Sequence, residues 1–171
     1  RPKEIADQSV KEVGVLGAGM MGAGIALVSA QAGLQVVLID QTQAAADKGK
    51  AYSEAYMDKG IKRGKATAEK KQAVLDKIIA TTEYQALSDA DLIIEAVFED
   101  PKVKAEITGA VEAIIPKNCI FASNTSTLPI SELAKASARP EQFIGIHFFS
   151  PVERMALVEI IKGKSTGDRA V

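Results

Sequence analysis

Short apolar runs along the chain alternate with longer segments whose apolar residues recur at helical spacing. Residues 13–16 form an apolar run that ends in glycines, and residues 20–32 then mix small and apolar residues in a helical pattern. Gly33 ends this helix, and residues 35–39 form a second apolar run. The order strand, helix, strand predicts two parallel neighbouring strands, because a helical crossover connects strands that run in the same direction.

The rest of the chain continues this alternation. Residues 43–79 are rich in Ala, Lys, Glu and Gln, with breaks near Gly60 and Gly64, which predicts two helices joined by a turn. Asp100 and Pro101 form an N-cap and first-turn pair that opens a helix reaching about residue 115. Further strands are expected at 91–96, 120–122, 143–146 and 157–161, and a short helix at 129–136. The pattern predicts an α/β fold, a doubly wound and mostly parallel sheet with an inserted helical hairpin.

Size and composition indicate one domain without a strongly charged surface. The 171 residues, 47% of them hydrophobic and 25% charged, are enough for one globular core. A formal net charge of −1 supplies no general basic field, so we expect no nucleic acid partner. The longest uncharged apolar stretch, residues 13–39, is interrupted by glycines and polar residues, so we expect no membrane span. The single cysteine, Cys119, excludes an internal disulfide, and its apolar neighbours predict a buried thiol.

A glycine-rich motif follows the first predicted strand. Gly17, Gly19 and Gly22 occupy a G-x-G-x-x-G pattern where the next helix opens. The first glycine permits a tight turn, the second lets the backbone approach a pyrophosphate, and the third lets the helix pack closely on the sheet. The free N–H groups at the helix start then bind phosphates without a lysine. The sequence therefore predicts a Rossmann-type dinucleotide site, the alternative being a tight turn without a ligand.

Asp40, at the end of the second predicted strand, distinguishes between dinucleotides. A carboxylate there can accept hydrogen bonds from both ribose hydroxyls of the adenosine half. It would repel a 2′-phosphate, and no arginine follows within residues 41–48 to bind one. The sequence therefore favours NAD, although Asp40 taken alone could be a solvated acid at a strand end.

The only histidine, His147, lies at the carboxyl end of a predicted strand, where the active sites of open α/β sheets lie. Beside two phenylalanines it could equally be a hydrogen-bonded core residue. Glu159 is flanked by apolar residues in a strand that we expect to be buried, and a buried carboxylate needs a partner. A loop turned at Pro151 would return Glu159 towards His147, where it would fix the imidazole tautomer. The alternative places Glu159 at a sheet edge, in water or paired with Lys162 or Arg154.

Several motifs together resemble the L-3-hydroxyacyl-CoA dehydrogenases, and especially the dehydrogenase part of the bacterial multifunctional fatty-acid oxidation enzyme. The resemblance covers nearly the whole chain. Its motifs are Val-Leu-Gly-Ala-Gly-Met-Met-Gly at 15–22, Glu-Ala-Val-Phe-Glu at 95–99, Ala-Ser-Asn-Thr-Ser-Thr-Leu at 122–128, the His147 segment and Leu-Val-Glu-Ile-Ile at 157–161. Residues 1–12 also resemble the linker that follows the enoyl-CoA hydratase part of such multifunctional chains.

This resemblance implies NAD-dependent oxidation of an L-3-hydroxyacyl-CoA to a 3-ketoacyl-CoA in fatty-acid β-oxidation. It makes His147 the general base, Glu159 the residue that orients it, and Ser126 a third catalytic residue that also binds substrate near its oxygen. Together with the glycine motif and Asp40, it implies NAD contacts at Gly17, Gly19, Met21, Gly22, Asp40, Ala96, Val97, Glu99, Lys104 and Asn124. Ser126 could otherwise be an ordinary turn hydroxyl, and Glu99 and Lys104 solvated charges at a helix start.

The helical hairpin predicted at residues 43–79 corresponds to the family's segment that receives coenzyme A. Its cations are Lys59, Lys62, Arg63, Lys65, Lys70 and Lys71. Of these we expect Lys59, Lys62 and Lys65 to bind substrate, because local cations can hold the CoA phosphates despite a neutral total charge. The alternative is a solvated helical face.

The chain also departs from the family pattern. Ser150 stands where many monofunctional members have asparagine. The family's second, all-helical domain, which supplies another active-site asparagine, most of the acyl pocket and the dimer contact, is absent. We therefore expect the segment to bind NAD but to turn over weakly or not at all.

The ends of the chain suggest a longer parent protein. The first residue is not methionine, and we assign residues 1–12 to a linker and 13–171 to a Rossmann domain that is truncated at its carboxyl end. Residues 164–171 look like the start of a further helix. The resemblance adds an enoyl-CoA hydratase part on the same chain, a thiolase partner, and a cytoplasmic location in bacteria or a mitochondrial or peroxisomal one in eukaryotes. The competing hypotheses are an NAD-dependent dehydrogenase of a free hydroxy acid or sugar acid, and a non-catalytic NAD-binding module.

Overall fold

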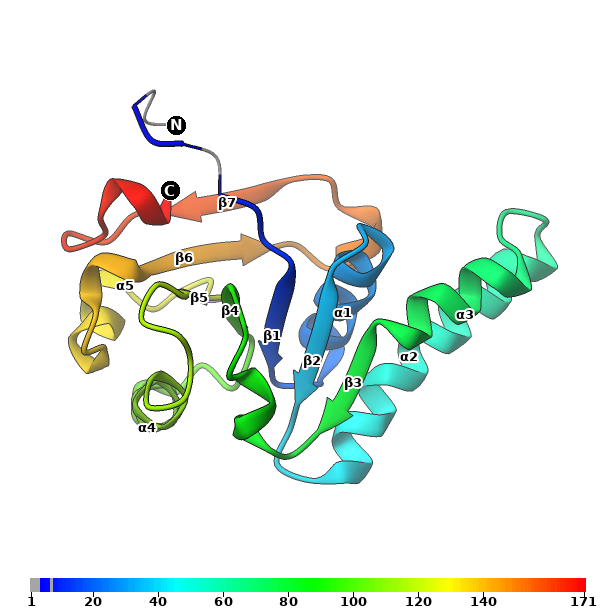
Figure 1. The fold of residues 1–171 in the computed structure, drawn as a ribbon, viewed down its shortest axis with the longest axis horizontal. Coiled ribbons are helices and arrows are strands. Elements are labelled where there is room, and N and C mark those ends of the chain that lie inside the picture. The colour runs from blue at the N-terminus through cyan, green and yellow to red at the C-terminus, as the bar shows by residue number, and fades with distance from the viewer. Residues whose placement is uncertain (1–3, 7) are drawn as a thin grey trace.

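One mixed sheet flanked by helices makes up the part of the chain that the computed structural model describes, residues 4–6 and 8–171 (Figure 1). The strands are β1 (Glu12–Leu16), β2 (Gln35–Ile39), β3 (Ile78–Thr81), β4 (Leu92–Glu95), β5 (Ile120–Ser123), β6 (Phe143–Phe148) and β7 (Val158–Ile161). The α-helices are α1 (Met20–Gln31), α2 (Gln43–Lys62), α3 (Ala68–Asp76), α4 (Pro101–Glu112) and α5 (Ile130–Leu133). Short 3-10 helices are η1 (Tyr84–Leu87), η2 (Ala134–Ala136), η3 (Pro140–Gln142), η4 (Val152–Arg154) and η5 (Asp168–Ala170).

The sheet has seven strands in the order β3-β2-β1-β4-β5-β6-β7. Neighbours from β3 through β6 are parallel, and only β7 runs antiparallel to its neighbour β6. The strand order reverses at β1, which lies between β2 and β4, and ligands of such sheets bind outside the carboxyl ends at this switch point. The predicted doubly wound, mostly parallel fold is confirmed.

Helices cover both faces of the central strands. On one face, Ile25 and Leu27 of α1 and Met57 of α2 form a buried cluster with side chains of β1 and β2. On the other, Val111 of α4 and Leu133 of α5 form a second cluster with side chains of β4, β5 and β6. Burying both faces explains why the central strands are continuous apolar runs rather than alternating ones.

The helical hairpin is confirmed, but it ends earlier than predicted. Thr42 and Thr67 cap α2 and α3 by accepting hydrogen bonds from backbone N–H groups, and the hairpin extends away from the sheet (Figure 1). The chain then enters β3, which pairs with β2, whereas we expected helix up to residue 79. Two β-branched residues begin this short strand, and Ile78 is fully buried, so packing favours the extended form.

β7 contradicts the prediction of a buried strand. Ile160 is 49% exposed, and the Glu159 side chain is 51% exposed. Within residues 4–6 and 8–171, β7 pairs only with β6 and therefore forms an edge of the sheet. The premise that Glu159 is a buried carboxylate is therefore wrong.

Two other expectations can be compared with the described residues. Cys119 is buried, as predicted. None of the described helices combines the length and the apolar character that crossing a bilayer requires.

Candidate active site and nucleotide cleft

A cleft of about 910 Å³ opens at the carboxyl ends of β1, β2 and β4. Its walls come from the glycine-rich loop, the end of β2 and the turn between β4 and α4. Seven of the predicted cofactor residues line it, namely Gly17, Gly19, Met21, Asp40, Ala96, Val97 and Glu99. Segments that are distant in the sequence therefore meet in one cleft at the switch point of the sheet.

Two of the three motif glycines, Gly17 and Gly22, occupy positions that a side chain would not fit. Gly17 has φ +94°, and a Cβ there would lie 2.5 Å from the Ala96 carbonyl oxygen. A Cβ on Gly22 would lie 1.7 Å from the Gly17 carbonyl oxygen, so Gly22 permits the close packing of α1. A Cβ on Gly19 would meet nothing within 4 Å, which leaves its backbone open to the cleft.

The start of α1 suits an anion. Gly19 is its N-cap and offers no side-chain cap, and the first turn carries no acidic residue. The N–H groups of this turn are thus available to a ligand, and the helix dipole favours negative charge there. These features fit a dinucleotide pyrophosphate.

Asp40 already holds the glycine loop in place. Its Oδ2 accepts a hydrogen bond from the Ala18 N–H at 2.8 Å, and its Oδ1 accepts one from the Gln41 N–H at 2.7 Å. Each carboxylate oxygen has a second lone pair that a ribose hydroxyl can use. Asp40 therefore connects the end of β2 to the loop and still faces the cleft.

His147 and Glu159 contact one another across β6 and β7. They occupy directly opposite positions in the antiparallel register, and Nδ1 of His147 lies 2.9 Å from Oε2 of Glu159. A carboxylate at Nδ1 favours the neutral tautomer that is protonated there, which leaves the Nε2 lone pair as a proton acceptor. The Phe149 ring packs against the imidazole with 4.5 Å between centroids. The alternative partner Lys162 instead pairs with Asp168 at 2.9 Å.

The loop after β5 links the cleft to this pair. Asn124 Oδ1 accepts a hydrogen bond at 2.9 Å from the N–H of Phe148, the residue after His147. Glu99 Oε2, on the opposite wall, accepts a hydrogen bond from Thr125 Oγ1 at 2.7 Å. Ser126 is exposed on the same loop, where its hydroxyl can meet a ligand. Asn124 thus connects this loop to the backbone beside His147, and Ser126 is exposed two residues further on.

The glycine loop also approaches the segment that follows His147. Met20, the first residue of α1, lines the cleft and is 70% exposed. Its sulfur lies 3.8 Å from Oγ of Ser150. The nucleotide cleft therefore adjoins the segment that follows His147.

The lysines of the hairpin lie outside the cleft. Lys59, Lys62 and Lys65 are exposed in the last turn of α2 and just after it, and they do not line the cleft. Lys71 is partly neutralised, because its ammonium lies 2.8 Å from Asp58 and 3.1 Å from Glu54. The hairpin lysines therefore do not contact the nucleotide cleft. A binding role for them would have to involve a different ligand from the dinucleotide.

A hydrogen bond ties the hairpin to the segment after β6. Tyr52 of α2 donates its hydroxyl to Glu153 Oε1 of η4 at 2.8 Å. Burial and the neighbouring Glu153 carboxylate raise the pKa of Tyr52. The base of the hairpin is therefore held against the segment that leads away from His147.

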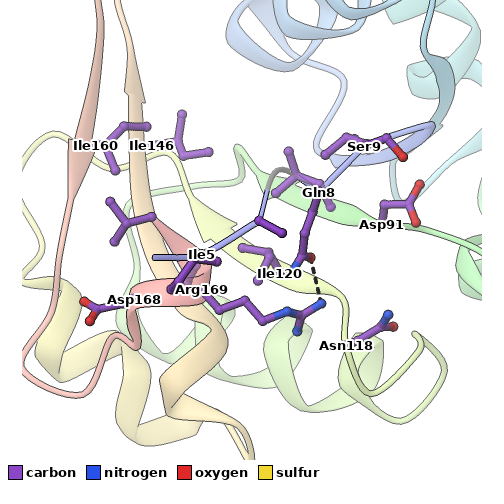
Figure 2. A pocket seen from close by; sticks show the side chains of 15 residues that line it. Ile5, Gln8, Ser9, Asp91, Asn118, Ile120, Ile146, Ile160, Asp168 and Arg169 are labelled. Atoms are coloured by element: carbon purple, nitrogen blue, oxygen red, sulfur yellow. Dashed lines mark hydrogen bonds between the residues drawn. The ribbon is translucent and has the colours of Figure 1, made fainter. Parts of the chain in front are cut away.

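A second pocket, of about 750 Å³, lies on another side of the sheet (Figure 2). Ile120, Ile146 and Ile160 give it an apolar wall, and Arg169 donates a hydrogen bond to Gln8 at 2.8 Å beside it. None of the predicted site residues lines this pocket. It is therefore separate from the nucleotide cleft.

Comparison with known proteins decides the family. Residues 12–171 match the family model described as 3-hydroxyacyl-CoA dehydrogenase, NAD binding domain. The chain belongs to this family. The resemblance in the sequence is thereby confirmed, and NAD is the cofactor of the cleft.

Similar proteins include much longer chains. The chain is 46% identical over 166 residues to the fatty acid oxidation complex subunit alpha of Idiomarina loihiensis. The aligned region covers 97% of this chain and 23% of that protein. It is 40% identical over 171 residues to the protein of the same name in Colwellia psychrerythraea, covering 100% of this chain and 24% of that protein. The chain thus spans about a quarter of the length of these curated relatives.

Solved structures share the fold. The crystal structure of (S)-3-hydroxybutyryl-CoA dehydrogenase from Ralstonia eutropha is similar, with a TM-score of 0.92 and 42% sequence identity over 95% of this chain and 57% of that chain. That of 3-hydroxybutyryl-CoA dehydrogenase from Escherichia coli K12 has a TM-score of 0.92 and 36% identity over 95% of this chain and 34% of that chain. The 3-hydroxyacyl-CoA dehydrogenase NAD-binding domain therefore accounts for the whole described architecture.

Within this family domain, Lys104 lies elsewhere than we expected. We predicted a residue lining the cofactor, or else a solvated charge, but its side chain is 1% exposed and does not line the cleft. Its ammonium lies 2.6 Å from Oε2 of Glu95, beneath the cleft wall. Lys104 faces inward because α4 packs this side against the sheet, where a buried ammonium requires a charged partner.

Glu95 and Ser123 are buried polar residues beside the cleft wall whose partners the sequence analysis did not predict. Both end their strands, β4 and β5, and both are buried. The sequence contains a sign that Glu95 is buried, because this residue ends the apolar run Leu-Ile-Ile-Glu. A carboxylate in such a run predicts a buried partner.

Proposed function

We propose that this chain is the NAD-binding part of a longer enzyme that oxidises an L-3-hydroxyacyl-CoA to the 3-ketoacyl-CoA. The observation that carries the proposal is the contact between His147 and Glu159 beside the NAD cleft. A base next to a nicotinamide site suits dehydrogenation of an alcohol, which releases one proton and one hydride. The NAD, when bound, supplies the hydride acceptor.

The residues of the pair divide the proton chemistry between them. His147 takes the hydroxyl proton on Nε2 while the C3 hydride leaves the substrate, and in the reverse direction it returns that proton. Glu159 holds Nδ1 at 2.9 Å and stabilises the imidazolium that forms. Ser126, exposed on the loop after β5, would donate a hydrogen bond to the substrate oxygen.

The substrate class is proposed from the hairpin and the relatives. Lys59, Lys62 and Lys65 are exposed cations that suit the phosphates of coenzyme A. They lie on the helical pair that Tyr52 holds beside the segment after β6. An acyl thioester extended from these cations towards His147 would reach the nicotinamide end of the cleft.

The relatives support a proposal about the parent protein and its partners. Proteins named fatty acid oxidation complex subunit alpha are about four times as long as the matched segment. We propose an enoyl-CoA hydratase part on the same chain, a thiolase partner, and a helical domain after residue 171 that completes the acyl pocket and carries the dimer contact. The residues before β1, which begins at Glu12 and not at residue 13 as we expected, then serve as a linker.

The deciding experiment compares two substrates in the full-length enzyme. NAD reduction is followed with 3-hydroxybutyryl-CoA and with free 3-hydroxybutyrate. We expect turnover of the thioester at a much lower Michaelis constant than that of the free acid. Comparable use of the free acid would indicate a hydroxy-acid dehydrogenase, and NAD binding without turnover of either would indicate a non-catalytic module.

A further inference from the structure

Glu95 has the only buried carboxylate within residues 4–6 and 8–171, and it is fully hydrogen-bonded. The residue is 1% exposed, at the carboxyl end of β4. Its Oε2 accepts from the Lys104 ammonium at 2.6 Å and from the Val97 N–H at 3.1 Å. Its Oε1 accepts from the Ser123 hydroxyl at 2.9 Å. Three donors from three segments therefore converge on one buried group.

The bond to Val97 holds one wall of the NAD cleft. Val97 belongs to the turn between β4 and α4 that lines the cleft. The backbone of this turn lies against the first motif glycine, because a Cβ on Gly17 would be 2.5 Å from the Ala96 oxygen and 3.3 Å from the Val97 nitrogen. A movement of this turn would therefore be transmitted directly to the glycine loop.

The bond to Ser123 holds the end of β5, which leads into the loop at 124–127. Ser123 is the last residue of β5, and Asn124 follows it with a hydrogen bond to the backbone beside His147. Lys104 adds a second connection, since its ammonium lies 3.5 Å from Ser123 Oγ and 4.0 Å from Glu99 Oε1. The group of Glu95, Lys104 and Ser123 thus joins β4, α4 and β5 beneath the cleft.

We propose that Glu95 is a positioning residue for NAD. Its carboxylate, with Lys104 and Ser123, fixes the spacing between the turn at 96–99 and the loop at 124–127, and this spacing admits the nicotinamide half of the cofactor. The inference rests on NAD binding and not on the proposed substrate. Its failure is thus distinct from a failure of the acyl-CoA assay.

A purely structural ion pair predicts a different result. Replacing a buried pair by apolar residues of similar volume is often neutral or stabilising, whereas removing one partner strands a charge. A structural pair would therefore allow the double replacement to recover both stability and NAD affinity. A positioning pair would allow it to recover stability alone.

The test measures thermal unfolding and NAD affinity by calorimetry on the same preparations of the 171-residue chain. The variants are Glu95→Gln, Lys104→Met and the double variant Glu95→Leu with Lys104→Met. We expect both single variants to unfold at lower temperature and the double variant to regain most of the loss. In the double variant the dissociation constant of NAD should still rise about tenfold or more, the effect of losing one strong positioned hydrogen bond.

Two controls separate positioning from general damage. Thr108→Val removes a buried hydrogen bond at 2.7 Å to the Lys104 carbonyl on the same helix, without touching the turn, and should leave NAD affinity unchanged. Binding of AMP, which occupies only the adenosine half near Asp40, should stay unchanged in the double variant. Equal loss of AMP and NAD binding would overturn the proposal.

Ser123 gives a test that does not require removing a charge. Ser123→Ala should raise the dissociation constant of NAD about two- to tenfold, the range for one hydrogen bond, and Ser123→Thr should restore it. If the double variant does not fold, this pair of variants decides the question. Wild-type affinity in Ser123→Ala, or in a folded double variant, would assign the group to folding alone.

Discussion

Nδ1 of His147 lies 2.9 Å from Oε2 of Glu159, at directly opposite positions of the antiparallel strands β6 and β7. Side chains opposite one another in such a pair project to the same face of the sheet. The contact is therefore set by strand register rather than by a mobile loop. Glu159 is half exposed, so its contact with His147 contributes little to the stability of the fold.

This geometry predicts that the two residues act as one unit in the full-length enzyme. His147→Ala should lower turnover about 10²- to 10⁴-fold, the usual range for a lost general base. Glu159→Gln should lower it less, because the imidazole stays in place. The double variant should be hardly worse than His147→Ala, since no base remains to be oriented. Steady-state kinetics of the three variants measure this.

An ion pair on the same edge of the sheet supplies the control. Asp168 lies 2.9 Å from Lys162, the residue after β7, and touches neither member of the pair. Asp168→Asn should leave turnover unchanged. Fully additive losses in the double variant of His147 and Glu159 would contradict the proposed unit.

Asp40 predicts a preference for NAD over NADP. Asp40→Ala should weaken NAD binding by about 1–3 kcal/mol, the scale of hydrogen bonds to a charged acceptor, and should narrow the preference. Asp40→Asn retains an acceptor for the Ala18 N–H and should mainly narrow the preference. Titration of each variant with both dinucleotides checks this, with Asp47→Ala as the control for an exposed carboxylate on α2. Equal affinity of the wild-type chain for NADP would refute the assignment.

The sequence predicts best those cleft residues that lie close together along the chain. Gly17, Gly22 and Asp40 lie within one strand, helix, strand unit, and the physical roles of the glycines follow from their spacing. Gly17 and Asp40 both line the cleft, and Gly22 lets α1 pack closely behind it. β3 was missed because it follows α3 almost without a link, and pairing with β2 overrides the helical pattern around Ile78.

The buried carboxylate was assigned to the wrong glutamate. We expected Glu159 to be buried because apolar residues flank it, but β7 is an edge strand and those neighbours are exposed. Glu95 has a similar apolar setting in a central strand and is truly buried. Apolar flanks alone do not reveal a strand's place in the sheet, and this place decides whether a charge needs a buried partner. The contact between His147 and Glu159 was thus predicted correctly from a wrong premise.

The exposed lysines of the hairpin predict an effect on one ligand only. Replacing Lys59, Lys62 and Lys65 with glutamate should raise the Michaelis constant for the acyl-CoA and leave that for NAD nearly unchanged, because these side chains lie outside the cleft. Steady-state kinetics of the full-length enzyme with each ligand varied in turn measure both constants. The control reverses three exposed lysines elsewhere, Lys117, Lys135 and Lys164. If the control has the same effect, or both constants move together, the hairpin lysines form a solvated face.

Cys119 predicts a specific dependence of stability on alkaline pH. Burial raises the pKa of its thiol to about 12, so the thiol stays protonated in the folded chain far above its ordinary value of 9.0. The unfolded chain releases this proton above about pH 9. The contribution of the Cys119 thiol to the free energy of unfolding is therefore constant below pH 9. Between about pH 9 and pH 12 the free energy of unfolding falls by at most about 1.4 kcal/mol per pH unit.

Denaturant unfolding at pH 7, 9, 10 and 11 measures this slope in the wild-type chain and in Cys119→Ala. The variant should be less stable at pH 7 because it leaves a small cavity, but its stability should fall less steeply above pH 9. Tyr52 and Tyr84, whose pKa values burial also raises, leave a remaining slope that both proteins share. The native thiol should also resist a disulfide reagent at pH 8 and react once the chain unfolds. Parallel curves for the two proteins, or fast labelling of the native chain, would show that the thiol ionises while folded.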